Sequence, residues 1–393
     1  MRMRKATSAL VGLLLAGVAA TPAHADTVRS KQWHLDAMKA DEIWKISTGK
    51  GITVAVIDSG IGKVPELEGQ VLAGKDFVTG SAGDERTDLT NHGTGMAATI
   101  AGTGKGPGGD GAFGLAPGAK ILPIRVPDML EAATTPSWSA AIRYAADSDA
   151  KIINISQGRP GRPEDDQERA AAVKYALSKG KLIFAAVGNS GDSTNEIAYP
   201  GATPGVVGVG AVDAQGEALK ISQHGPQVDL SAPGNAIIAA CTGKTGICTG
   251  TGTSAASALA SASAALLWSA HPDWTNNQVL RVLLNTAGKP TDGSQRNDFV
   301  GYGVVRPRIA LPTPGDPGPA NVWPLPDLGA EEAAKSPSAS ADGKAPNSAS
   351  PKPAPQAAED KNDGNLLPWI ALGLGACLLI GGAVTAVVVR RNR

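Results

Sequence analysis

The sequence predicts an α/β protein with a mostly parallel sheet and helices on both faces. Short apolar runs, rich in β-branched residues, alternate with Ala-rich stretches typical of helices. The runs are apolar at successive positions, which indicates strands buried on both faces. Their alternation with helices is typical of parallel strands joined by crossovers. The expected strands are 51–58, 119–126, 151–156, 181–187 and 205–211, and the expected helices include 137–147 and 164–178.

Length and charge narrow the possible function classes. The chain has 393 residues, 42% of them hydrophobic, which is enough for one large domain with additional segments. Its formal net charge is zero, so no overall field draws it toward nucleic acid. We therefore predict no nucleic-acid partner.

The first 25 residues have the pattern of a secretory signal peptide. Basic residues at the start are followed by an apolar run over 9–20, and small residues at Ala23 and Ala25 flank a cleavage point. The alternative is a buried first helix. The signal peptide is therefore predicted over 1–25, followed by an N-terminal extension over 26–48.

The C-terminal part has the pattern of a membrane anchor. Residues 366–389 carry no charge and are long enough to span a bilayer as a helix. The arginines in 390–393 favour a short cytoplasmic tail, which leaves the rest of the protein outside the cell. Residues 311–365 are rich in Pro, Ala and Ser and are predicted to be a disordered tether. The alternative for the apolar run is a buried core helix.

Two of the three cysteines are candidates for a disulfide. Cys377 lies in the predicted span, which leaves Cys241 and Cys248 in a part of the chain expected outside the cell. The alternative is a pair of free thiols. No His or Cys cluster and no Asp-rich loop of ligand spacing is visible, so we predict no metal and no cofactor.

Four polar residues lie where an α/β protein places its chemistry. Asp58 ends the first predicted strand, and sites of open α/β sheets gather at the carboxyl ends of strands. His92 and Ser254 each lie at the start of a predicted helix, and Asn189 follows another strand. Each also has an ordinary structural interpretation, such as a turn residue or a helix N-cap.

The four polar residues lie within or beside five short motifs. The motifs are 54–60 (VAVIDSG), 92–94 (HGT), 154–158 (NISQG), 186–189 (AVGN) and 252–254 (GTS). Taken together, these motifs resemble those of the subtilases, a family of serine proteases. The resemblance covers residues 49–310 and implies a subtilisin-like fold with a triad in the order Asp, His, Ser.

The resemblance implies a role for each of the four polar residues. A serine hydroxyl is a weak nucleophile, so Ser254 needs His92 as its general base. Asp58 would hold the tautomer of His92 and stabilise the imidazolium. Asn189 and the backbone N–H of Ser254 would form the oxyanion hole. The implied reaction is peptide-bond hydrolysis through an acyl-enzyme.

The same resemblance implies a binding strand for the substrate. Asn154, Ile155, Ser156, Gln157 and Gly158 would pair with the substrate backbone as an added strand. Backbone pairing suits a peptide or protein substrate.

A finer resemblance rests on the N-terminal residues 32–35 (QWHL) and 40–51 and on the order of the predicted segments. These features resemble those of the mycosins, membrane-anchored subtilases associated with type VII secretion. The resemblance implies a type VII secretion complex as partner, and an extension that stays attached. We expect the extension to pack on the domain surface away from the triad, through four large apolar residues. These are Trp33, Leu35, Ile43 and Trp44.

Some positions depart from the subtilase pattern. Ala258 replaces a usual proline, Ser257 a usual alanine, and Gln157 a usual apolar residue, while 127–137 replaces a Gly-rich edge strand of the cleft. The cleft is therefore expected to be reshaped. This leaves a second hypothesis, in which a weakly active or inactive subtilase body is a scaffold that stabilises a secretion complex.

Overall fold

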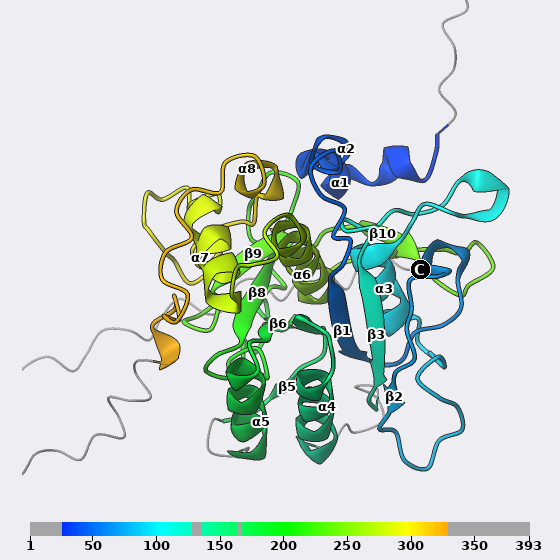
Figure 1. Ribbon diagram of the computed structural model, residues 1–393, viewed down its shortest axis with the longest axis horizontal. Coiled ribbons are helices and arrows are strands. Elements are labelled where there is room, and N and C mark those ends of the chain that lie inside the picture. Colours follow the sequence, from blue (N-terminus) through cyan, green and yellow to red (C-terminus); the bar gives the residue numbers. More distant parts are fainter. Residues whose placement is uncertain (1–25, 128–134, 163–166, 329–393) are drawn as a thin grey trace, which may run out of the picture. The chain divides into compact units, whose positions relative to one another are not determined.

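A seven-stranded parallel sheet forms the centre of the part that the structure describes (Figure 1). This computed structural model describes residues 26–127, 135–162 and 167–328. The strand order is β2-β3-β1-β4-β6-β8-β9. The strands are β1 (Thr53–Asp58), β2 (Lys75–Asp76), β3 (Lys120–Arg125), β4 (Ile152–Ile155), β6 (Leu182–Ala186), β8 (Val207–Val212) and β9 (Leu230–Pro233).

Both faces of the sheet are buried, as the apolar runs predicted. In β1, Val54 and Val56 belong to one hydrophobic cluster, and Ala55 and Ile57 to another on the opposite face. β1 lies between β3 and β4 in parallel register. The prediction of a mostly parallel sheet is confirmed, and all five expected strands are present with ends that differ by at most two residues.

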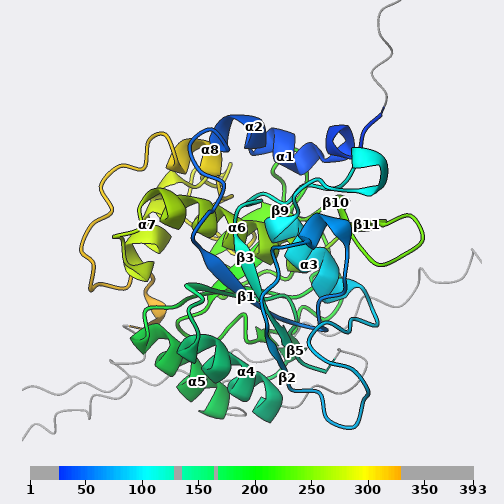
Figure 2. The ribbon, with the colours of Figure 1, turned by 45° about the vertical axis from the view of Figure 1, so that its right-hand side comes forward.

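Helices cover the two faces of this sheet (Figure 2). The helices α4 and α5 pack together beside one hydrophobic cluster, whereas α3, α6 and α7 belong to the other. The longer helices are α3 (His92–Ala101), α4 (Thr135–Asp147), α5 (Gln167–Ser178), α6 (Thr253–Ala270) and α7 (Asn276–Thr286), and a short α8 spans Pro307–Ala310.

The N-terminal extension is folded onto the domain. It contains the short helices η1 (Arg29–Lys31), α1 (Trp33–Ala37) and α2 (Ala40–Ile43). Leu35 and Ile43 are buried in the larger hydrophobic cluster. The indole N–H of Trp33 donates to Asn235 O at 2.9 Å, and that of Trp44 to Leu115 O at 2.8 Å. The expected packing through these four residues is confirmed.

The chain beyond α8 differs from the prediction. Residues 312–328, here called the C-terminal strap, run along α7 instead of starting a disordered tether. Arg281 on α7 donates to Pro317 O at 2.8 Å and Pro319 O at 3.0 Å, and Leu325 is buried. A predicted tether that begins at 311 is therefore wrong for this stretch, because α7 provides partners for backbone groups that composition alone cannot foresee.

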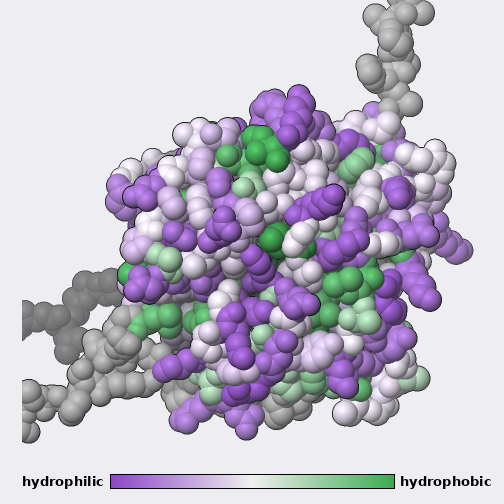
Figure 3. All heavy atoms as spheres, in the orientation of Figure 1, coloured by the Kyte–Doolittle hydropathy of each residue, from purple (hydrophilic) through white to green (hydrophobic). Residues whose placement is uncertain are grey.

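Smaller sheets lie at the rim. Two-residue strands β5 (Arg159–Pro160) and β7 (Ala198–Tyr199) pair, as do β10 (Ile237–Ala240) and β11 (Ile247–Gly250). Short 3₁₀ turns η2 (Pro65–Leu67) and η3 (Pro107–Gly109) complete the elements. On the face in Figure 3, small apolar patches are separated by polar residues.

The two predicted membrane-targeting segments lie outside the described residues. These are the signal peptide over 1–25 and the span over 366–389. Within the residues that the structure does describe, no helix combines the length and hydropathy needed to cross a bilayer.

Candidate active site

The fold brings the four predicted catalytic residues to one edge of the sheet. Asp58 is the last residue of β1, and Asn189 follows β6. His92 is the first residue of α3, and Ser254 the second of α6. His92, Asn189 and Ser254 line one cleft with a volume of about 660 Å³. Because parallel strands end at the same edge, residues far apart in sequence meet here.

Asp58 and His92 form a hydrogen-bonded pair. Asp58 is fully buried, and its Oδ1 lies 2.7 Å from Nδ1 of His92. The same oxygen accepts from Ser59 N at 2.8 Å. An ionised carboxylate only accepts hydrogen bonds, so the proton of a neutral His92 is held on Nδ1. Nε2 is then left as the basic nitrogen.

A second carboxylate holds the segments around this pair. Asp88 accepts from Ser59 Oγ at 2.9 Å, from Thr94 N at 2.8 Å and from Thr94 Oγ1 at 2.5 Å. Ser59 Oγ also accepts from Gly93 N at 3.0 Å. The loop after Asp58 and the first turn of α3 are therefore joined through one polar network. Sequence reasoning missed Asp88, although it lies only four positions before His92.

Asn189 is oriented by the start of α6. Its Oδ1 accepts from Thr253 N at 2.9 Å and Thr253 Oγ1 at 3.1 Å, which leaves the Nδ2 amide hydrogens as donors. Gly252 has φ +146°, and a Cβ there would lie 2.9 Å from Asn189 Nδ2. Only glycine fits this approach. The Gly-Thr of the 252–254 motif thus shapes the site of the predicted oxyanion donor.

Ser254 is linked to the end of β4. Its hydroxyl donates to Ser156 O at 2.9 Å, and Ser156 Oγ donates back to Ser254 O at 3.1 Å. Because Ser254 lies in the first turn of α6, its backbone N–H has no partner within the helix. That N–H is the kind of donor that an oxyanion hole requires.

Only part of the predicted substrate-binding set lines the cleft. Ser156, Gln157 and Gly158 do so. Ile155 is buried in a hydrophobic cluster, and Asn154 is fully buried.

Asn154 instead ties β4 to α6. Its Oδ1 accepts from Ser257 Oγ at 3.0 Å and Ser261 Oγ at 3.1 Å, and its Nδ2 donates to Ser156 Oγ at 2.9 Å. The serine at 257, where alanine is usual, is thereby explained as a buried partner of Asn154. Two buried hydroxyls and one amide satisfy each other here.

The cleft has walls that the sequence motifs do not include. Gln157 is 2% exposed, and its Oε1 has no partner among the described residues. Met96 lies one helical turn after His92, a spacing from which it could have been found. The other unpredicted lining residues include Pro160, Ala198, Ser190 and Gln223. Residues 128–134, expected to form an altered wall, lie outside the described part of the chain.

Cys241 and Cys248 are joined by a disulfide in the structure, with their Cα atoms 5.8 Å apart. The bond closes the turn between β10 and β11. Elsewhere in the described residues, no group of three or more His, Cys, Asp or Glu side chains is arranged to hold a metal ion.

Comparison with known families agrees with this geometry. The model of the subtilase family, Peptidase_S8, matches residues 49–303. The chain belongs to the subtilase family. This subtilase is 32% identical to Mycosin-1 of Mycobacterium tuberculosis over 340 residues, which cover 74% of this chain and 75% of that protein. It is 36% identical to the thermophilic serine proteinase of Bacillus sp. (strain AK1), over 63% of this chain and 60% of that protein.

Solved structures of mycosins have the same fold. The crystal structure of MycP1 from Mycobacterium smegmatis superposes with a TM-score of 0.65 at 29% identity, over 74% of this chain and 86% of that one. The MycP3 protease from the type VII (ESX-3) secretion system gives a TM-score of 0.62 at 32% identity, over 71% and 87%. This subtilase is thus a subtilisin-like serine protease related to the mycosins.

Proposed function

We propose that this subtilase is a membrane-anchored extracellular serine endopeptidase with Asp58, His92 and Ser254 as its triad. One observation carries the proposal: the buried Asp58 carboxylate lies 2.7 Å from Nδ1 of His92, and His92 shares a cleft with Ser254. Such a pair has the geometry of a general base with its orienting group.

The geometry supports a two-step reaction. The Ser254 hydroxyl leaves its hydrogen bond to Ser156 O and attacks the substrate carbonyl carbon as Nε2 of His92 takes its proton. Asn189 Nδ2 and Ser254 N–H stabilise the oxyanion. His92 then protonates the leaving amine, and water hydrolyses the acyl-enzyme by the same route. Asp58 keeps Nδ1 protonated throughout.

The substrate class follows from the cleft. Ser156, Gln157 and Gly158 follow β4 at the cleft wall, where an extended peptide can pair with the backbone. A role in type VII secretion rests on the mycosin relatives, since the MycP3 structure is described as a protease from such a system. Protein components or cargo of a secretion complex are therefore the proposed partners.

Fluorophosphonate labelling of the full-length protein in detergent tests this function. These reagents phosphonylate an activated serine and need no knowledge of the natural substrate. We expect covalent labelling and peptide hydrolysis, with both lost in Ser254→Ala. Hydrolysis that continues undiminished in Ser254→Ala would show that the triad assignment is wrong.

The second candidate is a scaffold with weak or no proteolysis. The observation in its favour is that the Ser254 hydroxyl donates to Ser156 O, a contact that a nucleophile must break. An unlabelled wild-type protein that still stabilises a membrane complex would favour this function over the enzyme.

The proposed domain layout has a separate test on cells. We propose a signal peptide over 1–25, an extension over 26–48, a catalytic domain from 49, a tether ending at 365, and a span over 366–389. Protease added to intact cells should release the domain, while a tag after Arg393 stays protected. Loss of the tag instead would reverse the orientation.

A further inference from the structure

An unusual backbone conformation immediately precedes His92. Asn91 is the N-cap of α3 and has φ +64°, in the left-handed region. Asn enters this region more readily than most residues, but a non-glycine residue stays there only when its surroundings hold it. Its side chain makes no capping bond to the helix. Something outside α3 therefore fixes Asn91.

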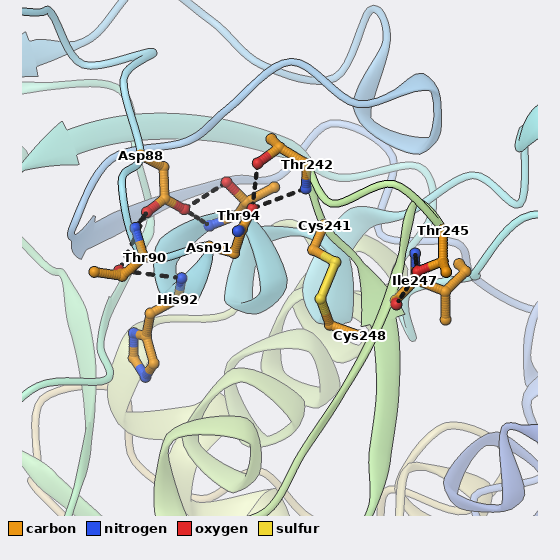
Figure 4. The surroundings of a disulfide bond; sticks show 10 residues. All are labelled: Asp88, Thr90, Asn91, His92, Thr94, Cys241, Thr242, Thr245, Ile247 and Cys248. Atoms are coloured by element: carbon orange, nitrogen blue, oxygen red, sulfur yellow. Dashed lines mark hydrogen bonds between the residues drawn. A yellow bond between two sulfur atoms is a disulfide. The ribbon is translucent and has the colours of Figure 1, made fainter.

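The partner of Asn91 is the disulfide-closed turn (Figure 4). Asn91 Oδ1 accepts a hydrogen bond from Thr242 N at 2.8 Å and a second, short one from Thr242 Oγ1. Thr242 directly follows Cys241, which is bonded to Cys248. The start of α3 is thus fastened to a hairpin 151 residues away in sequence.

Thr242 also contacts the loop after Asp58. A Cβ built on Gly62 would lie 2.5 Å from Thr242 Cγ2, so glycine leaves the space that this methyl group occupies. Gly62 N donates to Thr94 Oγ1 at 2.8 Å, within the polar network around Asp88. One threonine therefore touches the segments that follow Asp58 and precede His92.

The hairpin reaches the predicted nucleophile as well. Its second strand, β11, ends at Gly250, shortly before Ser254, and Gly250 lines the cleft. Backbone pairing Ala239↔Cys248 and the bond from Cys241 N to Gly246 O make the hairpin one unit. Its closed form sets the position of both ends relative to each other.

We infer that Asn91 and Thr242 are positioning residues for His92, and that the Cys241–Cys248 disulfide acts through them. The three groups form a clamp that joins the start of α3 to the hairpin leading to Ser254. This inference rests on the proposed function. It adds that the position of His92 depends on a disulfide, and hence on redox conditions. Small displacements of a catalytic base cost rate out of proportion to stability, because transfer of a proton depends on distance and direction.

Matched substitutions isolate the clamp in the full-length protein. Asn91→Gly keeps the left-handed backbone but removes the acceptor, and Thr242→Val keeps the methyl group but removes the hydroxyl. We expect Asn91→Gly to lower kcat about five- to tenfold with KM within twofold of wild type, and Thr242→Val about threefold. Thr242→Ser, which retains the hydroxyl that donates to Asn91, should keep a rate close to that of wild type. A melting temperature close to wild type separates positioning from unfolding.

Reduction of the disulfide provides the decisive comparison. Wild type treated with mild reductant, and the double variant Cys241→Ser/Cys248→Ser, should both be labelled by fluorophosphonate more slowly than untreated wild type. The slowing should be as large as that caused by Asn91→Gly. Loss of the disulfide in the Asn91→Gly variant should slow labelling little further, because the effects of groups that act through one contact are non-additive. Fully multiplicative effects, or unchanged rates in Asn91→Gly and Thr242→Val alike, would overturn the clamp.

A readout without catalysis keeps the two proposals distinct. The imidazole nitrogen resonances of His92, assigned by their loss in His92→Gln, should shift in Asn91→Gly and on reduction. If wild type is inert toward the fluorophosphonate yet these resonances shift, the proposed function fails and the clamp stands. Unmoved resonances in an active enzyme would reject the clamp alone.

Discussion

The cleft, the N-terminal extension and the C-terminal strap of this subtilase are held by different combinations of contacts. Around His92, short polar contacts fix direction: Asp58 at 2.7 Å, and Asp88 through Ser59 and Thr94. At the N-terminal extension, buried apolar side chains such as Leu35 pack into the core, and the indoles of Trp33 and Trp44 add hydrogen bonds. The C-terminal strap is held mainly through backbone carbonyls that accept from α7.

This difference separates rate from stability. Polar contacts beside the cleft act on the geometry of a transition state. Contacts at the extension and the strap, whether apolar or polar, involve residues that do not line the cleft and act on the free energy of unfolding. Changes in the cleft should therefore alter catalysis with little effect on stability. Changes at the two ends should do the reverse.

The largest effect is expected in the cleft. Asp58→Asn retains the shape of the side chain but offers an N–H to Nδ1 of His92, which favours the wrong tautomer. We expect kcat to fall by about 10⁴-fold, with the melting temperature nearly unchanged. Steady-state hydrolysis of a peptide and thermal unfolding measure the two quantities. A loss of stability as large as the loss of rate would erase the contrast between the regions.

A large stability effect is expected at the extension. Leu35 is fully buried, so Leu35→Ala should lower the free energy of unfolding by about 2–5 kcal/mol through lost burial and a cavity. Leu35→Met, which conserves volume, should cost less than about 1.5 kcal/mol. Urea unfolding gives these values, and kcat per folded molecule should be unchanged in both. A marked rise in activity after removal of 26–48, without loss of stability, would make the extension an inhibitory propeptide.

A pH effect of intermediate size is expected at His34 in the same extension. Burial, followed by the charge of Arg29, lowers the pKa of the His34 imidazole to about 4. Neither ring nitrogen has a hydrogen-bond partner among the described residues. In the unfolded chain the pKa of His34 is near 6.5, so the unfolded state binds the proton first as pH falls. The contribution of neutral His34 to the free energy of unfolding is therefore present above pH 6.5 and is lost as pH falls toward 4. The loss is about 2 kcal/mol at pH 5.

His34→Phe tests the origin of this loss. The variant cannot titrate, so the difference in unfolding free energy between pH 7.5 and pH 5 should shrink by about 2 kcal/mol relative to wild type. An identical pH dependence in the two proteins would assign the loss to other groups.

The strands and motifs were predictable because their signals are local. A parallel strand buried on both faces reads as an apolar run, and five such runs were found. The strand β9 was missed because Leu230–Pro233 is short and contains serine and proline. The helix α7 was missed although Thr275 and Gln278 form a capping box at its start.

The contacts that shape the site were less predictable because they join distant segments. Thr253 orients Asn189 from 64 residues away, and Thr242 meets Asn91 from 151 residues away. No periodicity within either segment reports these pairings. The motifs indicated which residues have chemical roles, while the polar groups behind them became visible only once the fold had brought the loops together.

The smallest effect is expected at the C-terminal strap. Arg281 donates to the carbonyls of Pro317, Pro319 and Val322, so Arg281→Met removes these bonds but keeps the apolar stem. Water can replace bonds at this partly exposed site, and we expect a loss of only about 1–2 kcal/mol. Hydrogen exchange and proteolysis within the strap (312–328) should accelerate, whereas Arg308→Met, a control at an exposed arginine, should change neither. A fall in kcat in Arg281→Met would mean that the strap acts on the cleft, and the separation of rate from stability would then fail at this end of the domain.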